Sequence, residues 1–573
     1  MTAATGRKTK RIRFDEIGGF LANTIEDGDL LAIGGLFKQG RPLALIREVI
    51  RQRLTALKII SSPGSGFDVD LLIAAGCVAE TFLPAVTLET HMCPSFRRAV
   101  EAGTITAHCV DALSVVGGFL AAANGVPFQP VAAWKGSDVI KYNPLIREIT
   151  CPFTGEKLFA TKAIRPKLAL LHAQEADEFG NIRHLSTMTY ADQMIARSAD
   201  TVLVSVDRIV PSGDIISRPR ETSIPCIYVD AVVEIPFGAH PTGSFPNYSI
   251  DEAHIDSYAT YAEAARKGSP TGDANLQAYI ARHRTPRSRR LSHHRGWRYA
   301  HGRTGRGGTS IMMTTRSADH APDYSPAEMQ AVFLSRDLTD GELGAAGASA
   351  AIPMAAMLLA RLRHAPNLSI AGEMFVNPYP KQLWSSMLDD RALGACEAAE
   401  TFLELFAHSH RGLDFFFHNG MQIDQYGNIN LHHIGGTIDA PVMRGPGAAN
   451  ISYAVTSRRF YICTTVHTKR TFVPKVDFIT SPGYLQGPES YHAAGLQYGP
   501  KYCVTPLAVM DFDPETFRMR LKSVHEGISV DHVIAQTDFE LLVPEHVEIT
   551  DPPAPNELQL LRDVVDPKGL LRS

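Results

Sequence analysis

Residues 177–182 read DEFGNI and residues 424–429 read DQYGNI, so nearly the same six residues occur twice in this chain. Six residues can repeat by chance, so the flanking segments decide what the repeat means. Apolar runs typical of strands lie before and after each copy. These runs are residues 168–174, 201–206, 413–419 and 460–466. The similarity therefore extends well beyond the six residues.

The spacing within each copy is also the same. Gly180 lies 50 residues before Asp230, and Gly427 lies 50 residues before Asp477. Each of these aspartates opens a similar segment, VDAVVEIPFG in the first copy and VDFITSPG in the second. Two independent matches at equal spacing indicate that a whole fold is repeated.

The beginnings of the two copies agree as well. Residues 27–42 read DGDLLAIGGLFKQGRP, and residues 340–353 read DGELGAAGASAAIP. Each predicts a turn, a short strand, a glycine-rich loop and a helix that begins at a proline. Strands that alternate with helices favour parallel sheets covered by helices on both faces. We therefore predict an α/β fold of two homologous open halves, residues 1–270 and 322–573.

The repeated motif itself has two interpretations. In a turn, Asp would begin the reversal, Gly would supply a positive φ, and Asn would bond its own backbone. The motif could instead shape a loop of an active site. The first interpretation needs only the local sequence, and both stay open at this point.

Residues 271–321 differ from both halves, and we predict a disordered, arginine-rich linker there. Between 281 and 306 the chain has nine arginines and no acidic residue. Nucleic-acid binding is the alternative for this segment. GRTGRGGTS at 302–310 resembles a phosphate-binding loop only superficially, because no lysine precedes its Ser/Thr and no strand precedes the loop.

Composition limits the classes of function. The chain has 573 residues and a net charge of −4, which gives no overall field toward nucleic acid or an anionic membrane. Its eight cysteines form no CxxC pair, which favours a reducing, cytoplasmic setting. No apolar run reaches the length of a membrane span, and no signal peptide is evident.

Three segments could carry chemistry. The glycine-rich loop at 34–42 and the turn RGPGAAN at 444–450 could each present backbone N–H groups to an anion. Glu373 follows a short apolar run, at a strand end of the kind where α/β sheets bind ligands. His432 and His433 are adjacent, would point to opposite faces of a strand, and do not predict a metal site.

These motifs, in this order, resemble family I coenzyme A transferases of the glutaconate branch, with alpha-type and beta-type subunits joined in one chain. DGDLLAIGGLFKQGRP, GVPFQPV, HAQEADEFGNI and VDAVVEIPFGAHP resemble the alpha subunit. GMQIDQYGNIN, RGPGAAN and KRTFVPKVDFITSPG resemble the beta subunit. Two positions depart from the family pattern. Leu36 replaces a usual Phe, and Gly372-Glu373-Met374-Phe375 replaces the Ser-Glu-Asn-Gly of many relatives.

The resemblance implies the coenzyme A transferase fold and a ping-pong reaction between an acyl-CoA and a carboxylic acid. It implies that Glu373 attacks the thioester and becomes a glutamyl-CoA thioester, without a metal or redox cofactor. The oxyanion would be stabilised by backbone N–H groups of Gly445, Gly447, Ala448 and Ala449. Residues predicted to contact substrate or CoA are Gly34, Gly35, Gly40, Lys469, Arg470 and Lys475.

Two alternatives remain at this stage. One is a hydrolase on the same fold, which would open an acyl-CoA thioester or a ring-derived CoA ester with water. The other is a CoA-binding protein without catalysis. Glu373 favours the transferase. We further expect a homo-oligomer that binds neither nucleic acid nor a membrane.

Overall fold

The computed structural model describes residues 7–89, 91–186, 188–284, 323–347, 350–372, 374–378, 382–384, 396–448 and 451–572. The first half extends to residue 284, beyond the predicted boundary at 270. Helix α10 (Pro270–Arg284) packs its buried Leu276 and Ile280 into the first-half core. Residues 285–321 of the predicted linker lie outside the described residues, so its disorder stays a prediction.

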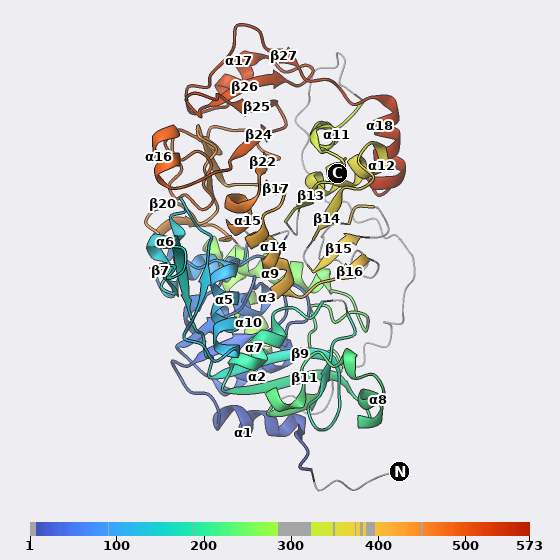
Figure 1. The fold of residues 1–573 in the computed structure, drawn as a ribbon. Helices are drawn as coiled ribbons and strands as arrows, with labels where there is room; N and C mark the ends of the chain where they lie inside the picture. The colour runs from blue at the N-terminus through green and yellow to red at the C-terminus, as the bar shows by residue number, and fades with distance from the viewer. Residues whose placement is uncertain are drawn as a thin grey trace.

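The first half is built on a nine-stranded sheet (Figure 1). All neighbours along the main path are parallel, and only the short β10 pairs antiparallel, with β9. Every residue of β9 is buried, because helices cover both faces of the sheet. The path runs β1 (Arg11–Ile12), β12 (Ala231–Glu234), β11 (Thr201–Ile209), β9 (Leu168–Ala176), β2 (Leu30–Ile33), β3 (Leu57–Ile60), β4 (Val78–Phe82) and β5 (Thr106–Ala107), with β10 at Ile182–Arg183.

The second half is built on a ten-stranded mixed sheet. Its centre, from β14 to β24, is parallel. Antiparallel pairs extend both sides, and β27 at one edge pairs parallel with β26. The order is β16 (Cys396–Ala399), β15 (Phe375–Pro378), β14 (Ser369–Ala371), β13 (Leu343–Ala345), β17 (Phe415–His418), β22 (Arg459–Cys463), β24 (Pro500–Val504), β25 (Ala508–Phe512), β26 (Met519–Val524) and β27 (Glu548–Ile549).

The strand order shows the repeat directly. In the first half, β2 to β5 follow one another in one direction, while β9, β11 and β12 extend in the other. In the second half, β13 and β14 extend one way, while β17, β22 and β24 extend the other. In each sheet the order of the strands therefore reverses at one place. This place lies between β2 and β9 in the first half and between β13 and β17 in the second. The predicted pair of homologous α/β halves is confirmed.

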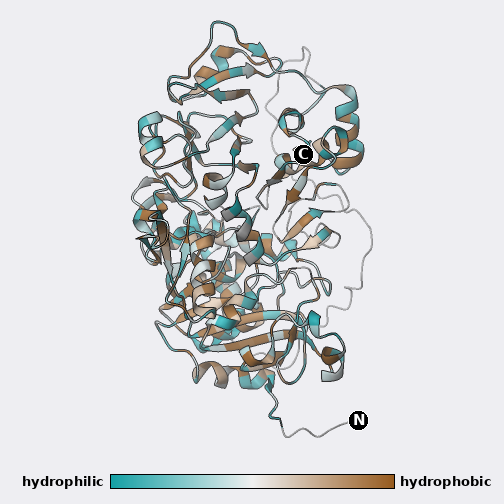
Figure 2. Cartoon of the chain, in the orientation of Figure 1, coloured by the Kyte–Doolittle hydropathy of each residue, from teal (hydrophilic) through white to brown (hydrophobic). Residues whose placement is uncertain are grey.

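Helices pack on both sheets, and the central strands are largely hydrophobic (Figure 2). Pro42 directly precedes α2, and Pro353 lies in the first turn of α12, so both prolines stand at helix starts. The first-half helices are α1 (Ile17–Ala22), α2 (Leu43–Gln52), α3 (Phe67–Ala74), α4 (Pro94–Glu101), α5 (Ala112–Ala123), α6 (Val139–Tyr142), α7 (Asp192–Ser198), α8 (Ser212–Ser217), α9 (Glu252–Arg266) and α10. Those of the second half are α11 (Pro326–Asp337), α12 (Ala351–Arg363), α14 (Phe402–Arg411), α15 (Ile451–Thr456), α16 (Pro488–Ala493), α17 (Val530–Ala535) and α18 (Pro555–Leu560). None of the helices in the described ranges is long and apolar enough to cross a membrane.

Three small sheets complete the fold, and they lie near the junction of the halves (Figure 1). Main-chain and side-chain bonds cross this junction. The Asp138 N–H donates to the Ile479 carbonyl at 2.8 Å, and the Ser137 hydroxyl donates to the Thr480 carbonyl at 2.7 Å. The small sheets comprise β6 (Phe128–Val131), β7 (Ile146–Thr150) and β8 (Lys157–Lys162); β18 (Gln422–Asp424), β19 (Ile429–Asn430) and β23 (Phe472–Val473); and β20 (His433–Gly436) and β21 (Pro441–Arg444).

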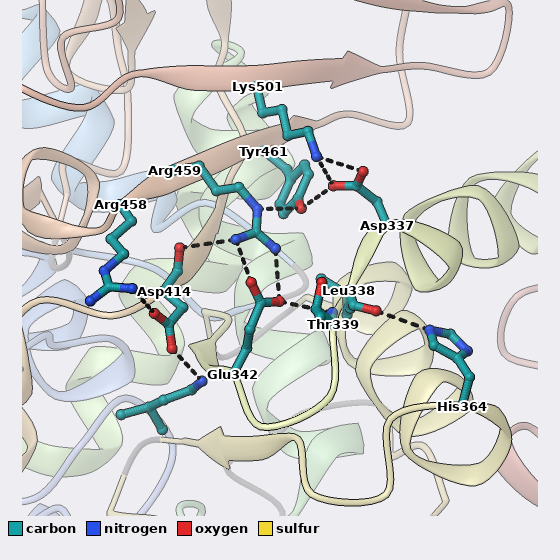
Figure 3. Close-up of polar contacts among 11 residues, drawn as sticks. Asp337, Leu338, Thr339, Glu342, His364, Asp414, Arg458, Arg459, Tyr461 and Lys501 are labelled. Atoms are coloured by element: carbon teal, nitrogen blue, oxygen red, sulfur yellow. Dashed lines mark hydrogen bonds and ion pairs between the residues drawn. The ribbon is translucent and has the colours of Figure 1, made fainter.

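The amino ends of the second-half strands are closed by a network of charged side chains (Figure 3). Arg459, at the start of β22, makes two hydrogen bonds to the Glu342 carboxylate at 2.7 and 2.8 Å. Its Nε donates to the Tyr461 hydroxyl, which donates to Asp337. Lys501 pairs with the same aspartate at 2.6 Å. Because the positive and negative side chains pair with one another here, we infer that the amino edge of the sheet contributes to stability. Ligands are then expected at the opposite edge, where the strands have their carboxyl ends.

Candidate active site

Three connections of the first half leave the carboxyl ends of neighbouring parallel strands. The glycine-rich loop at 34–42 follows β2, residues 61–66 follow β3, and residues 83–93 follow β4. The glycine-rich loop also stands where the sheet changes direction, between β2 and β9. Open α/β sheets bind ligands at this place. The topology therefore positions the predicted loop where a substrate would lie.

The N–H groups of the three predicted glycines are already bonded within the protein. Gly34 donates to the Leu170 carbonyl at 2.9 Å, and Gly40 donates to the Gly243 carbonyl at 2.8 Å. Gly35 donates to a carboxylate oxygen of Asp192 at 2.9 Å. These N–H groups are therefore not free to hold an anion. The loop can contact a substrate only through other atoms.

Close packing explains why glycine stands at two of these positions. A Cβ atom on Gly40, which has φ +61°, would lie 2.4 Å from the Tyr190 ring. A Cβ atom on Gly35, with φ +81°, would lie 2.6 Å from the Gln39 carbonyl oxygen. Both contacts are impossible for a larger residue. The glycines thus give the loop its shape.

A buried cation that the sequence analysis did not single out fixes this loop. Arg41 is fully buried, and its Nη1 donates to the Gly34 carbonyl at 2.9 Å and to the Ser61 hydroxyl at 3.0 Å. Its Nη2 donates to the Gly64 carbonyl. The carboxylate of Asp68, also fully buried, lies 3.4 Å from Nη1. One guanidinium therefore holds the connections after β2 and β3 together.

The second-half loop after β21 is also held by its own backbone. The Gly445 N–H donates to the His432 carbonyl at 2.8 Å, and the Gly447 N–H donates to the Leu431 carbonyl at 3.0 Å. The antiparallel bridge between Ala85 and Gly447 directs the Ala448 N–H toward the Pro84 carbonyl. Ala449 lies outside the described residues. The oxyanion role of Gly445, Gly447 and Ala448 therefore stays a prediction.

This loop docks against the first half. Ala85 and Gly447 form an antiparallel bridge, and the Val86 N–H donates to the Pro446 carbonyl at 2.8 Å. A Cβ on Gly447, which has φ +81°, would lie 2.4 Å from the Pro84 carbonyl oxygen. The loop after β21 therefore meets the carboxyl edge of the first-half sheet. The two halves pack against each other at this place.

Contacts continue from this bridge to the glycine-rich loop. Ser65 pairs with Val86, the neighbour of Ala85, and a Cβ atom on Gly64 would lie within 2.3 Å of the Phe37 ring. The predicted loops from the two halves are therefore linked through residues 64–65 and 85–86. This arrangement brings candidate residues of both halves into one region.

Glu373 lies outside the described residues, and its neighbours in the chain are described. β14 ends at Ala371, which is the expected carboxyl end of a central parallel strand. The Gly372 N–H donates to the Phe375 carbonyl at 2.9 Å, and Met374 is fully buried with φ +73°. The chain therefore reverses tightly between β14 and β15. The role of Glu373 and its distance to the glycine-rich loop stay predictions.

Lys469, Arg470 and Lys475 flank the short strand β23, beyond the carboxyl end of β22. Their side chains form no ion pair or hydrogen bond with other described residues. Free cations at the carboxyl edge fit a role in holding CoA phosphates, and they fit a solvated surface equally well. Their predicted role therefore stays a prediction.

The neighbouring His467 supplies a pH-dependent contribution to stability. Its ring is buried between the Thr505 and Thr537 hydroxyls, at 2.9 and 3.1 Å, and stacks on Phe472. Burial lowers the pKa of His467 to about 4. Between pH 6.5 and 4 the unfolded chain therefore binds a proton that the folded protein does not. The stabilisation from the buried, neutral His467 ring is therefore complete above pH 6.5 and is lost as the pH falls through 4.

Replacing His467 with glutamine should remove that dependence. We expect the difference in unfolding free energy between wild type and His467→Gln to shrink by about 3 kcal/mol from pH 7 to pH 4. Urea unfolding at several pH values measures this difference. The exposed His546→Gln is the matched control and should leave the profile unchanged. An equal difference at both pH values would contradict the assignment.

The repeated DxxGN motif is a turn in both halves. The Asp177 carboxylate accepts hydrogen bonds from the Phe179 and Asn181 N–H groups. Asp424 accepts the equivalent bonds from Tyr426 and Asn428, and burial raises the pKa of its carboxyl to about 6. Gly180 and Gly427 have φ of +86° and +72°. The turn interpretation is confirmed, and the motif repeats because the fold repeats.

Histidines provide little evidence for a metal centre. His432 is buried, and its Nδ1 lies 2.7 Å from the Thr480 hydroxyl. His240, Asp251 and His254 lie together, with their ligand atoms within 4.8 Å of one another. His240 is hydrogen-bonded to Asp251 at 2.9 Å, and His254 to the Tyr279 hydroxyl at 2.6 Å. These bonds account for the cluster as the capped start of α9.

A family model for coenzyme A transferase matches residues 16–235 and 327–536. Each match covers one of the two halves. Relatives over part of the chain include one of the subunits of 3-oxoadipate CoA-transferase from Pseudomonas knackmussii, 34% identical over 240 residues, which are 41% of this chain and 83% of that protein. A cholesterol ring-cleaving hydrolase IpdA subunit from Rhodococcus jostii is 32% identical over 267 residues, or 45% of this chain and 88% of that one. An Archaeoglobus fulgidus protein is 35% identical over 247 residues, which are 42% of this chain and 53% of its own length.

One of the subunits of glutaconate CoA-transferase from Acidaminococcus fermentans is 30% identical over 256 residues, which are 43% of this chain and 94% of that protein. Across both halves, an acyl-CoA transferase of Escherichia coli O157:H7 has the same fold, with a TM-score of 0.65, 17% identity and coverage of 95% of each chain. The predicted fold class and enzyme class are confirmed, and the two alternatives are not favoured. The chain belongs to the coenzyme A transferase family, with two family repeats in one polypeptide.

Proposed function

We propose that this chain moves coenzyme A from an acyl-CoA to a carboxylic acid through a thioester on Glu373. The observation that supports this most is that both halves match the family and meet at one place. There the loop Gly445–Ala448 of the second half bridges to Ala85 at the carboxyl edge of the first. Glu373 follows β14, whose carboxyl end is on the corresponding edge of the second-half sheet.

The reaction proceeds by two equivalent half-reactions. The Glu373 carboxylate attacks the thioester carbonyl, the C–S bond breaks, and an acyl–glutamyl anhydride and CoA thiolate form. The thiolate then attacks the glutamyl carbonyl, which releases the first acid and leaves a glutamyl-CoA thioester. A second acid attacks this thioester and repeats the two steps in reverse. Electrons and atoms balance without a metal or redox cofactor.

The described residues would support this chemistry in three ways. Backbone N–H groups of the loop after β21 would donate to the oxyanion, and losing one such donor typically raises a barrier by about 3 kcal/mol. The bonds of Gly445 and Gly447 would hold this loop in place. The glycine-rich loop would line the acyl pocket through its side chains, and Lys469, Arg470 and Lys475 would contact CoA phosphates.

The cellular setting is part of the proposal. All eight cysteines are free thiols, which fits a reducing cytoplasm. We propose a cytoplasmic homo-oligomer that acts on acyl-CoA and carboxylic acids. Gel filtration with light scattering would test the oligomeric state.

Intact mass of the wild-type protein tests the covalent route. After mixing with acetyl-CoA alone, we expect a gain equal to the mass of CoA minus water. Added acetate should remove this adduct, and borohydride should trap it and inactivate the enzyme. Thiol release that needs no acid acceptor, with no adduct, would contradict transfer and indicate hydrolysis.

A further inference from the structure

The turn that carries Glu373 is the two-residue loop of a β-hairpin. β14 and β15 pair antiparallel through Ala371 and Val376. The next pair is closed by the Gly372 N–H, which donates to the Phe375 carbonyl at 2.9 Å. Glu373 and its successor are therefore the two residues of the loop. In type I′ and type II turns the second of these residues needs a positive φ, which glycine and asparagine adopt most easily.

Met374 occupies this second position and has a left-handed backbone. Its φ is +73°, a conformation that residues with a side chain disfavour and that β-branched residues hardly ever adopt. Residues strained in this way persist where the surrounding structure imposes the conformation, and they cluster at active sites. The contacts of Met374 show how the conformation is imposed here.

Two kinds of contact hold Met374 in place. Its side chain is fully buried, in the apolar cluster that also contains Phe402 and Leu405 of α14. Its carbonyl accepts a hydrogen bond from the Glu400 N–H at 2.9 Å, and the Glu400 carboxylate is itself bonded to His408 of α14 at 2.8 Å. Both the main chain and the side chain of Met374 are therefore fixed against the segment that begins α14.

The residue before Glu373 is fixed as well. A Cβ atom on Gly372 would lie 2.0 Å from the Phe375 ring, so this ring covers the Gly372 Cα closely. Further along the hairpin, the Asn377 side chain accepts a hydrogen bond from the Ile370 N–H at 2.9 Å. Both neighbours of Glu373 in the chain are therefore held. A nucleophile needs such support, since a misplacement of about 1 Å can lower a rate by about 100-fold.

We propose that Met374 is a positioning residue for the nucleophile. Its left-handed backbone, imposed by burial and by the Glu400 N–H, fixes the peptide that follows Glu373. Because its own side chain is fully buried, Met374 acts through Glu373 and not on the substrate. This inference rests on the proposed CoA transfer and adds a further residue to it. The property that matters is the backbone conformation at this position and not the thioether.

Substitutions that differ in their tolerance of a positive φ test this role. Met374→Val stays apolar but is β-branched, so we expect it to slow formation of the glutamyl-CoA adduct from acetyl-CoA by at least about tenfold. The KM for acetyl-CoA should stay close to that of wild type. Met374→Asn adopts a left-handed backbone readily and should form the adduct faster than Met374→Val, although it loses buried apolar contacts. Rapid quenching followed by intact mass gives the rate of adduct formation, and steady-state assays give KM.

Leu485 provides the matched control in the second half. It is also apolar, buried and left-handed, with φ +54°, and it belongs to a separate apolar cluster. Leu485→Val should lower the melting temperature, as Met374→Val should, and should keep the wild-type rate of adduct formation. Equal slowing in Leu485→Val would indicate a general loss of stability and would overturn the proposal.

Met374→Ala decides the case if Met374→Val does not fold. Alanine also removes the buried side chain but tolerates a positive φ less well than asparagine, so Met374→Ala should form the adduct more slowly than Met374→Asn. If Met374→Asn were no faster than the alanine and valine variants, the backbone conformation would not be what positions Glu373. A wild type that forms no adduct would instead refute the thioester on Glu373, and with it this role. A wild-type adduct that forms equally fast in Met374→Val would refute the positioning role alone.

Discussion

Replacing Glu373 with alanine should lower the rate of CoA transfer by more than about a hundredfold, a barrier increase above about 2.7 kcal/mol. The reason is that the substitution removes the only group proposed to form the thioester. Glu373→Gln keeps the shape of the side chain but loses the nucleophilic carboxylate. This variant should therefore also be inactive at the start of the assay. Transfer from acetyl-CoA to an acceptor acid, measured alongside intact mass, gives both the rate and the adduct.

The two readouts together make this test specific. Neither variant should gain the mass of CoA minus water, while CoA binding and thermal stability should stay close to wild type. Glu540→Ala removes an exposed second-half carboxylate and is the matched control. If Glu373→Ala kept more than about a hundredth of the wild-type rate, Glu373 would not be the nucleophile, and hydrolysis would become the better interpretation.

The repeat, the α/β class and the family could be predicted because they depend on local patterns. Strand-like runs, a turn motif with Asp and Gly at fixed offsets, and equal spacing all survive in one sequence. The extension of the first half through α10 was missed because its apolar residues are few and it borders the arginine-rich segment.

The contributions of individual site residues depend on tertiary partners and could not be predicted in the same way. Glycine-rich stretches suggested free N–H groups, but those of Gly35, Gly445 and Gly447 are bonded to partners elsewhere in the chain.

Arg41 in the first half also depends on partners that only the tertiary fold brings together. Its removal should have the largest effect on stability. It belongs to the predicted loop GGLFKQGRP, yet its partners Ser61, Gly64 and Asp68 come from later connections. Arg41→Met keeps much of the volume and leaves the Asp68 carboxylate buried without its cation. Breaking a buried ion pair in this way typically costs about 3–5 kcal/mol.

We therefore expect Arg41→Met to unfold at markedly lower urea concentration than wild type. Arg41→Lys should recover only part of the loss, because one ammonium group cannot reach the Gly34, Ser61 and Gly64 oxygens together. Arg13→Ala removes an exposed arginine paired with Asp15 and should leave the stability close to that of wild type. The double variant Arg41→Met/Asp68→Asn should be more stable than Arg41→Met alone, since it also removes the buried negative charge. If Arg41→Met were no less stable than Arg13→Ala, the guanidinium would not be what holds the connections after β2 and β3 together.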